Sequence, residues 1–154
     1  IEEICKYKAA YHGGLKKPEN DEAVDDMIYL IAAALGFASI ENALYVFGPL
    51  LIGDTELAIA TGNLRFIGAS LLHVATASII GASRAFSHFH TDGTKKRYIL
   101  SGFILAIALH SAFNLFIINN AESTFTAFSI VWIIIIIIIL IFERVKRIYV
   151  ERIK

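Results

Sequence analysis

Four long apolar stretches constrain the fold of this chain more than any other feature. They cover residues 27–47, 65–83, 98–118 and 124–142. A helix of about 20 apolar residues crosses the hydrocarbon core of a bilayer, where only helices and closed barrels satisfy their backbone groups. The stretches are too continuous for alternating strands. The sequence therefore predicts an all-α, polytopic transmembrane helical bundle with four full spans.

The connections between these stretches alternate in charge. Lys and Arg occur in residues 1–26, in 84–97 and in the tail at 143–154, and they are absent from 48–64 and 119–123. The positive-inside rule places the basic segments in the cytoplasm. We therefore expect a multi-pass protein of the cell membrane with a basic cytoplasmic tail.

The rest of the chain fits a single membrane-embedded domain, spanning residues 1–154. Residues 1–13 look like the end of a preceding helix, 14–26 like a solvated cytoplasmic linker, and 27–142 hold the four spans, as in the C-terminal fragment of a larger bundle. The seven isoleucines at 133–139 predict a lipid-facing anchor. A net charge of zero gives no reason to expect nucleic acid as a partner, and the single cysteine excludes an internal disulfide.

Ionisable residues interrupt three of the spans. Glu41, His73 and His110 lie inside them, and Asn114 follows His110 by one helical turn. A charge at membrane depth costs a few kcal/mol, so such residues usually mark a function. At 1.5 Å per residue, each ionisable residue lies about 9 to 12 Å from the expected outer end of its span. We therefore expect one polar site in the outer half of the bilayer.

Four short motifs carry a family resemblance. They are EExxKY at residues 2–7, ENxxY at 41–45, Arg65 with Leu72-His73, and HxxxN at 110–114. In this order they resemble the PrsW family of intramembrane proteases, which is grouped with the CAAX prenyl proteases. The resemblance implies a peptidase that cuts membrane-associated proteins, by analogy a membrane-anchored anti-sigma factor. It also implies that the motif glutamates and histidines are catalytic, namely Glu2, Glu3, Glu41, His73 and His110. Asn114 completes the set of candidate catalytic residues.

The residue types allow two hydrolytic routes. A glutamate can act as the base for a water that His73 and His110 orient, while Asn114 donates to the oxyanion. Alternatively, Glu41, His73 and His110 form a ligand set for zinc, with water in the open position. Both routes remain open from the sequence alone.

Other interpretations compete with a protease. Glu and His inside a bundle also make proton relays in carriers, although we find no internal repeat, and a catalytically inactive scaffold would contain the same helices. Taken singly, Glu41 could simply pair with Lys6 or Arg65. The remaining histidines, at positions 12, 88 and 90, lie outside the spans and are expected to be solvated.

Overall fold

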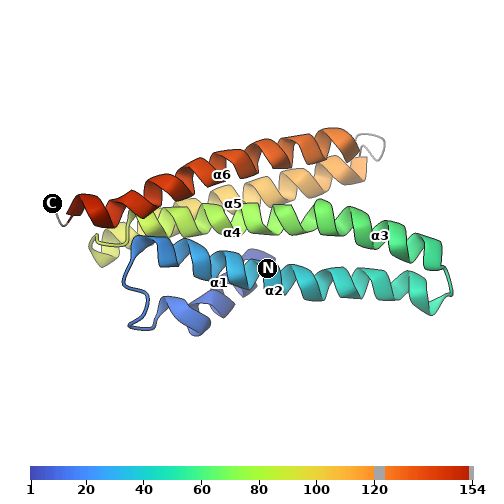
Figure 1. Ribbon diagram of the computed structural model, residues 1–154, viewed down its shortest axis with the longest axis horizontal. Coiled ribbons are helices and arrows are strands. Elements are labelled where there is room, and N and C mark those ends of the chain that lie inside the picture. The colour runs from blue at the N-terminus through green and yellow to red at the C-terminus, as the bar shows by residue number, and fades with distance from the viewer. Residues whose placement is uncertain (120–123, 153–154) are drawn as a thin grey trace.

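The computed structural model describes residues 1–119 and 124–152, and every regular element in these ranges is a helix (Figure 1). The elements are α1 (Glu2–Ala10), η1 (a π-helical segment, Tyr11–Leu15), α2 (Ala23–Leu51), α3 (Thr55–Ile67), α4 (Ala69–Phe86), α5 (Asp92–Asn119) and α6 (Thr124–Arg152). Four segments are long and apolar enough to cross a membrane: Ala23–Leu51, Thr55–Phe86, Asp92–Ile117 and Thr126–Ile148. The predicted all-α bundle with four spans is confirmed.

Most of the expected connection at 48–64 is helical in the structure, so this boundary prediction was wrong. Helix α2 continues through Pro49 to Leu51, and the chain then turns at Gly53, whose φ of 78° lies in the left-handed region that favours glycine. Asp54 caps α3 by accepting a hydrogen bond from the Leu57 N–H at 2.9 Å. The α2–α3 hairpin extends past the ends of α5 and α6 (Figure 1).

The other expected boundaries shift by a few residues. Helix α2 begins at Ala23, inside the expected linker, and α6 continues through the expected tail to Arg152. The start of α2 is stabilised by the Asp25 carboxylate, which accepts a hydrogen bond from the Glu22 N–H at 3.0 Å. Most of the expected short turn at 119–123 lies outside the described residues.

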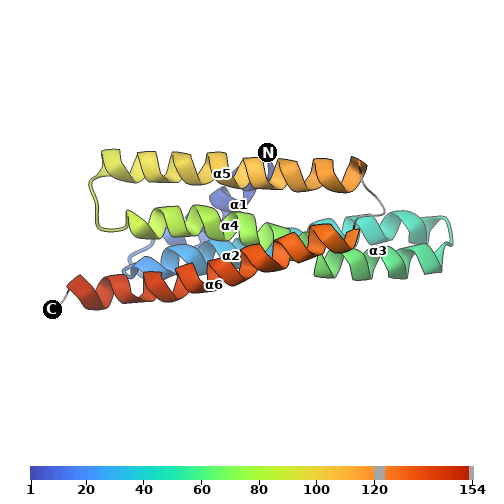
Figure 2. The same ribbon diagram turned by 90° about the horizontal axis from the view of Figure 1, so that it is seen from above.

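Helix α4 forms the centre of the bundle. Figure 2 shows α5 on one side of it and α2 and α6 on the other, and α4 contacts all three. In the most apolar part of the α3–α4 span, 56% of the residues are buried. The corresponding share is 17% in each of the other three spans. Small residues permit this close packing: a Cβ on Gly81 would lie 2.8 Å from the Cα of Met27 on α2.

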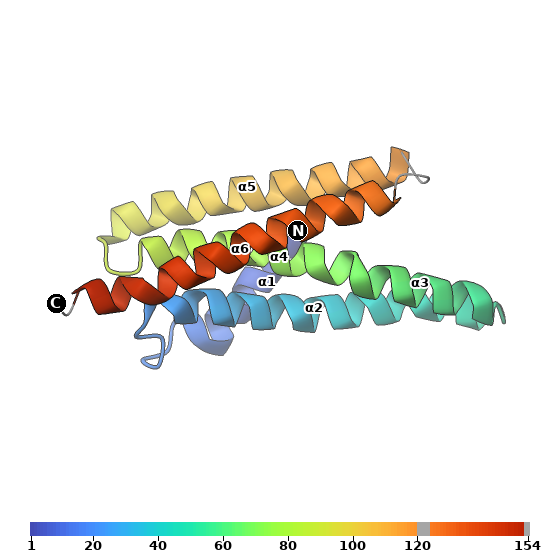
Figure 3. The ribbon, with the colours of Figure 1, turned by 45° about the horizontal axis from the view of Figure 1, so that its top comes forward.

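Helix α1 is short but enters the bundle. It contacts α2, α4 and α5, and its N-terminal end lies near the middle of the long axis (Figure 1 and Figure 3). This placement brings Glu2 and Glu3 to the depth of the polar residues on the longer helices. On α6, the isoleucines divide between two faces: Ile138 is buried, whereas Ile133, Ile136, Ile137 and Ile139 are exposed.

Candidate active site

Five ionisable side chains from four helices meet beside the N-terminal end of α1. His110 on α5 lies 2.7 Å from Glu3 (Nδ1 to Oε1) and 3.4 Å from Glu2 (Nε2 to Oε2). His73 on α4 lies 2.9 Å from Glu41 on α2 (Nε2 to Oε2) and 4.0 Å from Glu2 (Nδ1 to Oε2). The two imidazole rings are 5.3 Å apart. The polar residues of the separate spans therefore share one site.

Hydrogen-bond partners assign a tautomer to each histidine. An ionised carboxylate only accepts hydrogen bonds, so His110 donates from Nδ1 to Glu3 and His73 donates from Nε2 to Glu41. Lys6 supports the second assignment, because its ammonium has only donors and lies 3.4 Å from Nδ1 of His73. The remaining nitrogens, Nδ1 of His73 and Nε2 of His110, are thus lone-pair acceptors on the side that faces Glu2.

These acceptors fit a metal cation. One ligand atom from each of Glu2, His73 and His110 lies within 4.8 Å of the other two. The Oε2 atom of Glu2 is buried and has no hydrogen-bond partner among the described residues. Acceptors that face one another repel unless a cation or proton lies between them. Of the three, Nδ1 of His73 already has the Lys6 ammonium at 3.4 Å. The donor set, one carboxylate and two imidazoles, is one that zinc accepts.

The carboxylate in this group is Glu2, whereas the ligand set expected from the sequence contained Glu41. Glu41 instead forms an ion pair with Arg65 and accepts the hydrogen bond from the far nitrogen of His73. A carboxylate behind a ligating histidine fixes the ring and makes it more basic. Glu3 holds the same position behind His110. Of the three carboxylates, Glu2 therefore faces the histidine lone pairs, whereas Glu3 and Glu41 orient the two histidines.

Each orienting carboxylate has its own cation. Lys6, 1% exposed, donates to Glu3 at 2.6 Å and to Thr76 at 3.0 Å. Arg65 is paired with Glu41, and its guanidinium carbon lies 3.6 Å from the centroid of the Tyr45 ring. The i, i+3 spacing of Glu3 and Lys6 is a signal that the sequence contained. Of the two pairings considered for Glu41, the structure has the one with Arg65.

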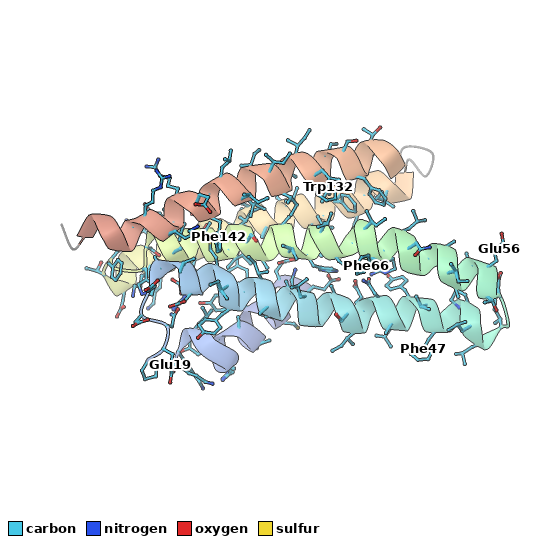
Figure 4. All side chains as sticks on the ribbon, viewed as in Figure 1. Glu19, Phe47, Glu56, Phe66, Trp132 and Phe142 are labelled. Atoms are coloured by element: carbon cyan, nitrogen blue, oxygen red, sulfur yellow. The ribbon has the colours of Figure 1, made fainter. Side chains whose placement is uncertain are left out.

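A cavity of about 470 Å³ opens at this group. It is lined by Glu2, Glu41, Tyr45, Leu64, Arg65, Ala69, Leu72, His73, His110, Phe113, Asn114, Ile117 and Phe128. Figure 4 shows side chains in the space between α2 and the α3–α4 span. Asn114 lines the cavity one helical turn beyond His110, where its amide faces the same space as the histidines.

A second buried polar cluster, which the sequence did not predict, lies near the start of α2. Asp26 is 0% exposed and accepts hydrogen bonds from Arg84 at 2.6 Å and from Asn20 at 3.1 Å, while His88 lies 2.7 Å away. The sequence predicted that Asp26, as part of the linker, and His88 would be solvated. Both predictions were wrong. Arg84 also donates to the Tyr7 hydroxyl at 3.3 Å. The cluster thereby ties α1 to α2 and α4.

Comparison of the chain with known proteins identifies its family. The family model described as PrsW family intramembrane metalloprotease matches residues 1–141. The chain belongs to this family. Among curated PrsW relatives, "Protease PrsW" of Clostridioides difficile is 30% identical over 115 residues, covering 74% of this chain and 47% of the relative. "Protease PrsW" of Oceanobacillus iheyensis is 31% identical over 147 residues, covering 96% of this chain and 63% of the relative.

The PrsW relatives are longer than the chain described here. The chain spans about half the length of the Clostridioides difficile relative and of a Geobacillus kaustophilus relative, which is 30% identical over 116 residues and is covered to 47%. No solved structure matches the chain.

Proposed function

We propose that this chain carries the hydrolytic site of an intramembrane endopeptidase that cuts membrane-associated proteins. One observation carries the proposal: Glu2, His73 and His110, from three helices, present three acceptors to one point beside a cavity. Membership of the PrsW family supports the same reading. A carrier would instead distribute such residues along a path through the bundle.

Glu2, His73 and His110 would hold the metal that the family description implies, and zinc suits these donors. When bound, the metal supplies Lewis acidity for the attacking water or the scissile carbonyl. Glu3 and Glu41 keep both imidazoles in the tautomer that directs a lone pair at this point. Lys6 and Arg65 hold those two carboxylates in place.

The cavity supplies the remaining requirements of peptide hydrolysis. Water attacks the carbonyl carbon, the C–N bond breaks, and the new amine leaves with a proton. In a metal-free route, Glu2 takes the proton from the attacking water and returns it to the leaving amine. The amide of Asn114 lies where it can donate to the oxyanion that forms meanwhile.

We propose further that cutting takes place in the outer half of the membrane. The basic residues near both ends of the chain support a cytoplasmic tail. His110 lies nine residues from the end of α5 at Asn119, or about 14 Å along the helix. His73 lies 18 residues after the start of α3 at Thr55, about 27 Å rather than the expected distance of about 12 Å, because the α2–α3 hairpin extends past α5 and α6 (Figure 1). A membrane-anchored protein such as an anti-sigma factor is the substrate that family analogy suggests.

The proposal is tested by incubating the membrane-reconstituted protein with a single-span substrate in H₂¹⁸O and analysing the fragments by mass spectrometry. We expect ¹⁸O in the new carboxyl group and loss of cleavage by about 10²- to 10⁴-fold in Glu2→Gln. Glu19→Gln, at an exposed position, is the matched control and should cleave normally. Cleavage by Glu2→Gln at the rate of the unchanged protein would contradict the proposal.

A second expected result concerns Glu41, which we propose positions His73. Glu41→Ala should weaken zinc affinity by about 10- to 100-fold, as loss of such an orienting partner does elsewhere. Glu41→Gln should keep most of the affinity, because the amide oxygen still accepts from Nε2 of His73. Titration of the purified variants with zinc measures both, with Glu56→Ala on the exposed start of α3 as the control. Equal affinities in Glu41→Ala and the unchanged protein would rule out the positioning role.

A further inference from the structure

We infer that the end of the cavity remote from the histidines is an apolar subsite that selects a bulky apolar side chain of the substrate, with Phe128 as its wall. The inference rests on the proposed hydrolytic function. It assigns substrate selection to residues outside the four motifs.

The chemistry of the cavity changes along α5. Beyond His110, the lining residues on this helix are Phe113, Asn114 and Ile117, spaced i+3, i+4 and i+7 on one face. Ile117 lies seven residues from His110, or about 10 Å along the helix axis. The cavity therefore runs from a polar end at the histidine to an apolar end nearly two turns away.

The opposite wall changes in the same direction. Starting at His73, the lining residues on α4 and α3 are Leu72, Ala69 and Leu64, in order of increasing distance along the chain. Arg65, also on this wall, is turned toward Glu41 and stacked on Tyr45. The positive charge of Arg65 is thus paired with Glu41 rather than free in the apolar end of the cavity.

Phe128 closes this end from α6. Its ring lies against Gly68, where α3 ends and α4 begins, and a Cβ at that position would overlap the ring. The absence of a side chain on Gly68 lets the ring approach the backbone, which places a flat aromatic wall over the junction between the two helices. The Phe128 ring therefore packs directly against the backbone of this junction.

A substrate bound for hydrolysis must pass along this wall. With its scissile carbonyl at the histidines, an extended strand advances about 3.3 Å per residue. The apolar end, about 10 Å away, therefore receives a side chain up to about three residues from the scissile bond. Because this end is continuous with the reacting group in a single cavity, its occupant is a part of the same substrate.

The test compares kcat/KM for single-span substrates in which Ala, Val, Leu or Phe stands at each of the three positions on either side of the cut. At one position we expect Leu or Phe to exceed Ala by about 10-fold or more, the usual effect of filling an apolar pocket. Phe128→Ala should reduce this preference to about 3-fold or less. Phe128→Trp, which narrows the pocket, should shift the preference toward smaller side chains.

Phe66→Ala is the matched control, since this phenylalanine of α3 is 74% exposed and does not line the cavity. It should keep the original preference. Cleavage without side-chain preference at any position, or an unchanged preference in both Phe128 variants, would overturn the inference and leave the proposed hydrolysis standing. Absence of cleavage for every substrate would overturn the proposed function and the inference with it.

Discussion

Replacing His110 with alanine is expected to abolish the proposed zinc binding of the purified protein and to reduce cleavage by at least about 100-fold. His110 supplies one of the three acceptors of the site, and its Nδ1–H is the donor to the buried Glu3. Loss of a group that only orients a ligand costs about 10- to 100-fold in affinity or activity, so loss of a ligand itself should cost more. Metal content by mass spectrometry and kcat/KM on one substrate measure the two effects.

The control for this experiment is His90→Ala, because this histidine is exposed and does not line the cavity. Its metal content and its cleavage rate should match those of the unchanged protein. A chelator should remove zinc and activity together from the unchanged protein, and added zinc should restore both. Full activity in zinc-free protein would refute the metal route and leave Glu2 as the base.

The convergence of the site was predictable from the sequence, but the division of roles within it was not. Ionisable residues in three apolar stretches indicated a shared site, since each is costly to bury alone. Whether Glu2 or Glu41 faces the histidine lone pairs depends on contacts between helices. Arg65 decides it by holding Glu41 at the far nitrogen of His73, and no spacing along the chain encodes that contact.

The number of spans was predictable, but some of their ends were not. Hydropathy indicates which residues suit lipid, whereas a helix ends where its backbone finds other partners. Helix α2 continues past the apolar stretch to Leu51, although Pro49 has no N–H to donate to the preceding turn, and the chain turns only at Gly53. An estimate of how deep a residue lies therefore changes when the end of its span is revised. The observed contacts between helices do not depend on where the spans end.

The cluster around Asp26 was missed for a related reason. An acidic residue near the end of a span is usually solvated or stabilises the first turn of a helix. Asp26 is buried because Arg84 and His88, near the end of α4, lie directly against it. The sequence separation of 58 residues between Asp26 and Arg84 hides this contact.

Asp26→Ala should therefore destabilise the protein by about 3–5 kcal/mol, the usual cost of leaving one partner of a buried ion pair alone. The change leaves the Arg84 guanidinium, whose side chain is only 16% exposed, without its carboxylate. Unfolding of the protein in mixed micelles by increasing denaturing detergent measures the change. Asp21→Ala, at an exposed position a few residues earlier, should change stability by less than about 0.5 kcal/mol.

The double variant Asp26→Ala with Arg84→Leu distinguishes two causes of the lost stability: the loss of the ion pair itself and the unpaired Arg84 charge that remains. If the unpaired guanidinium causes most of the loss, removing it should recover a large part of the stability, because apolar replacements of buried ion pairs are often neutral. Cleavage should remain impaired, however, since Arg84 also binds Tyr7 and the Leu15 carbonyl and so holds the helix that carries Glu2 and Glu3. A double variant that regains stability and full cleavage together would show that the cluster plays no part in positioning α1.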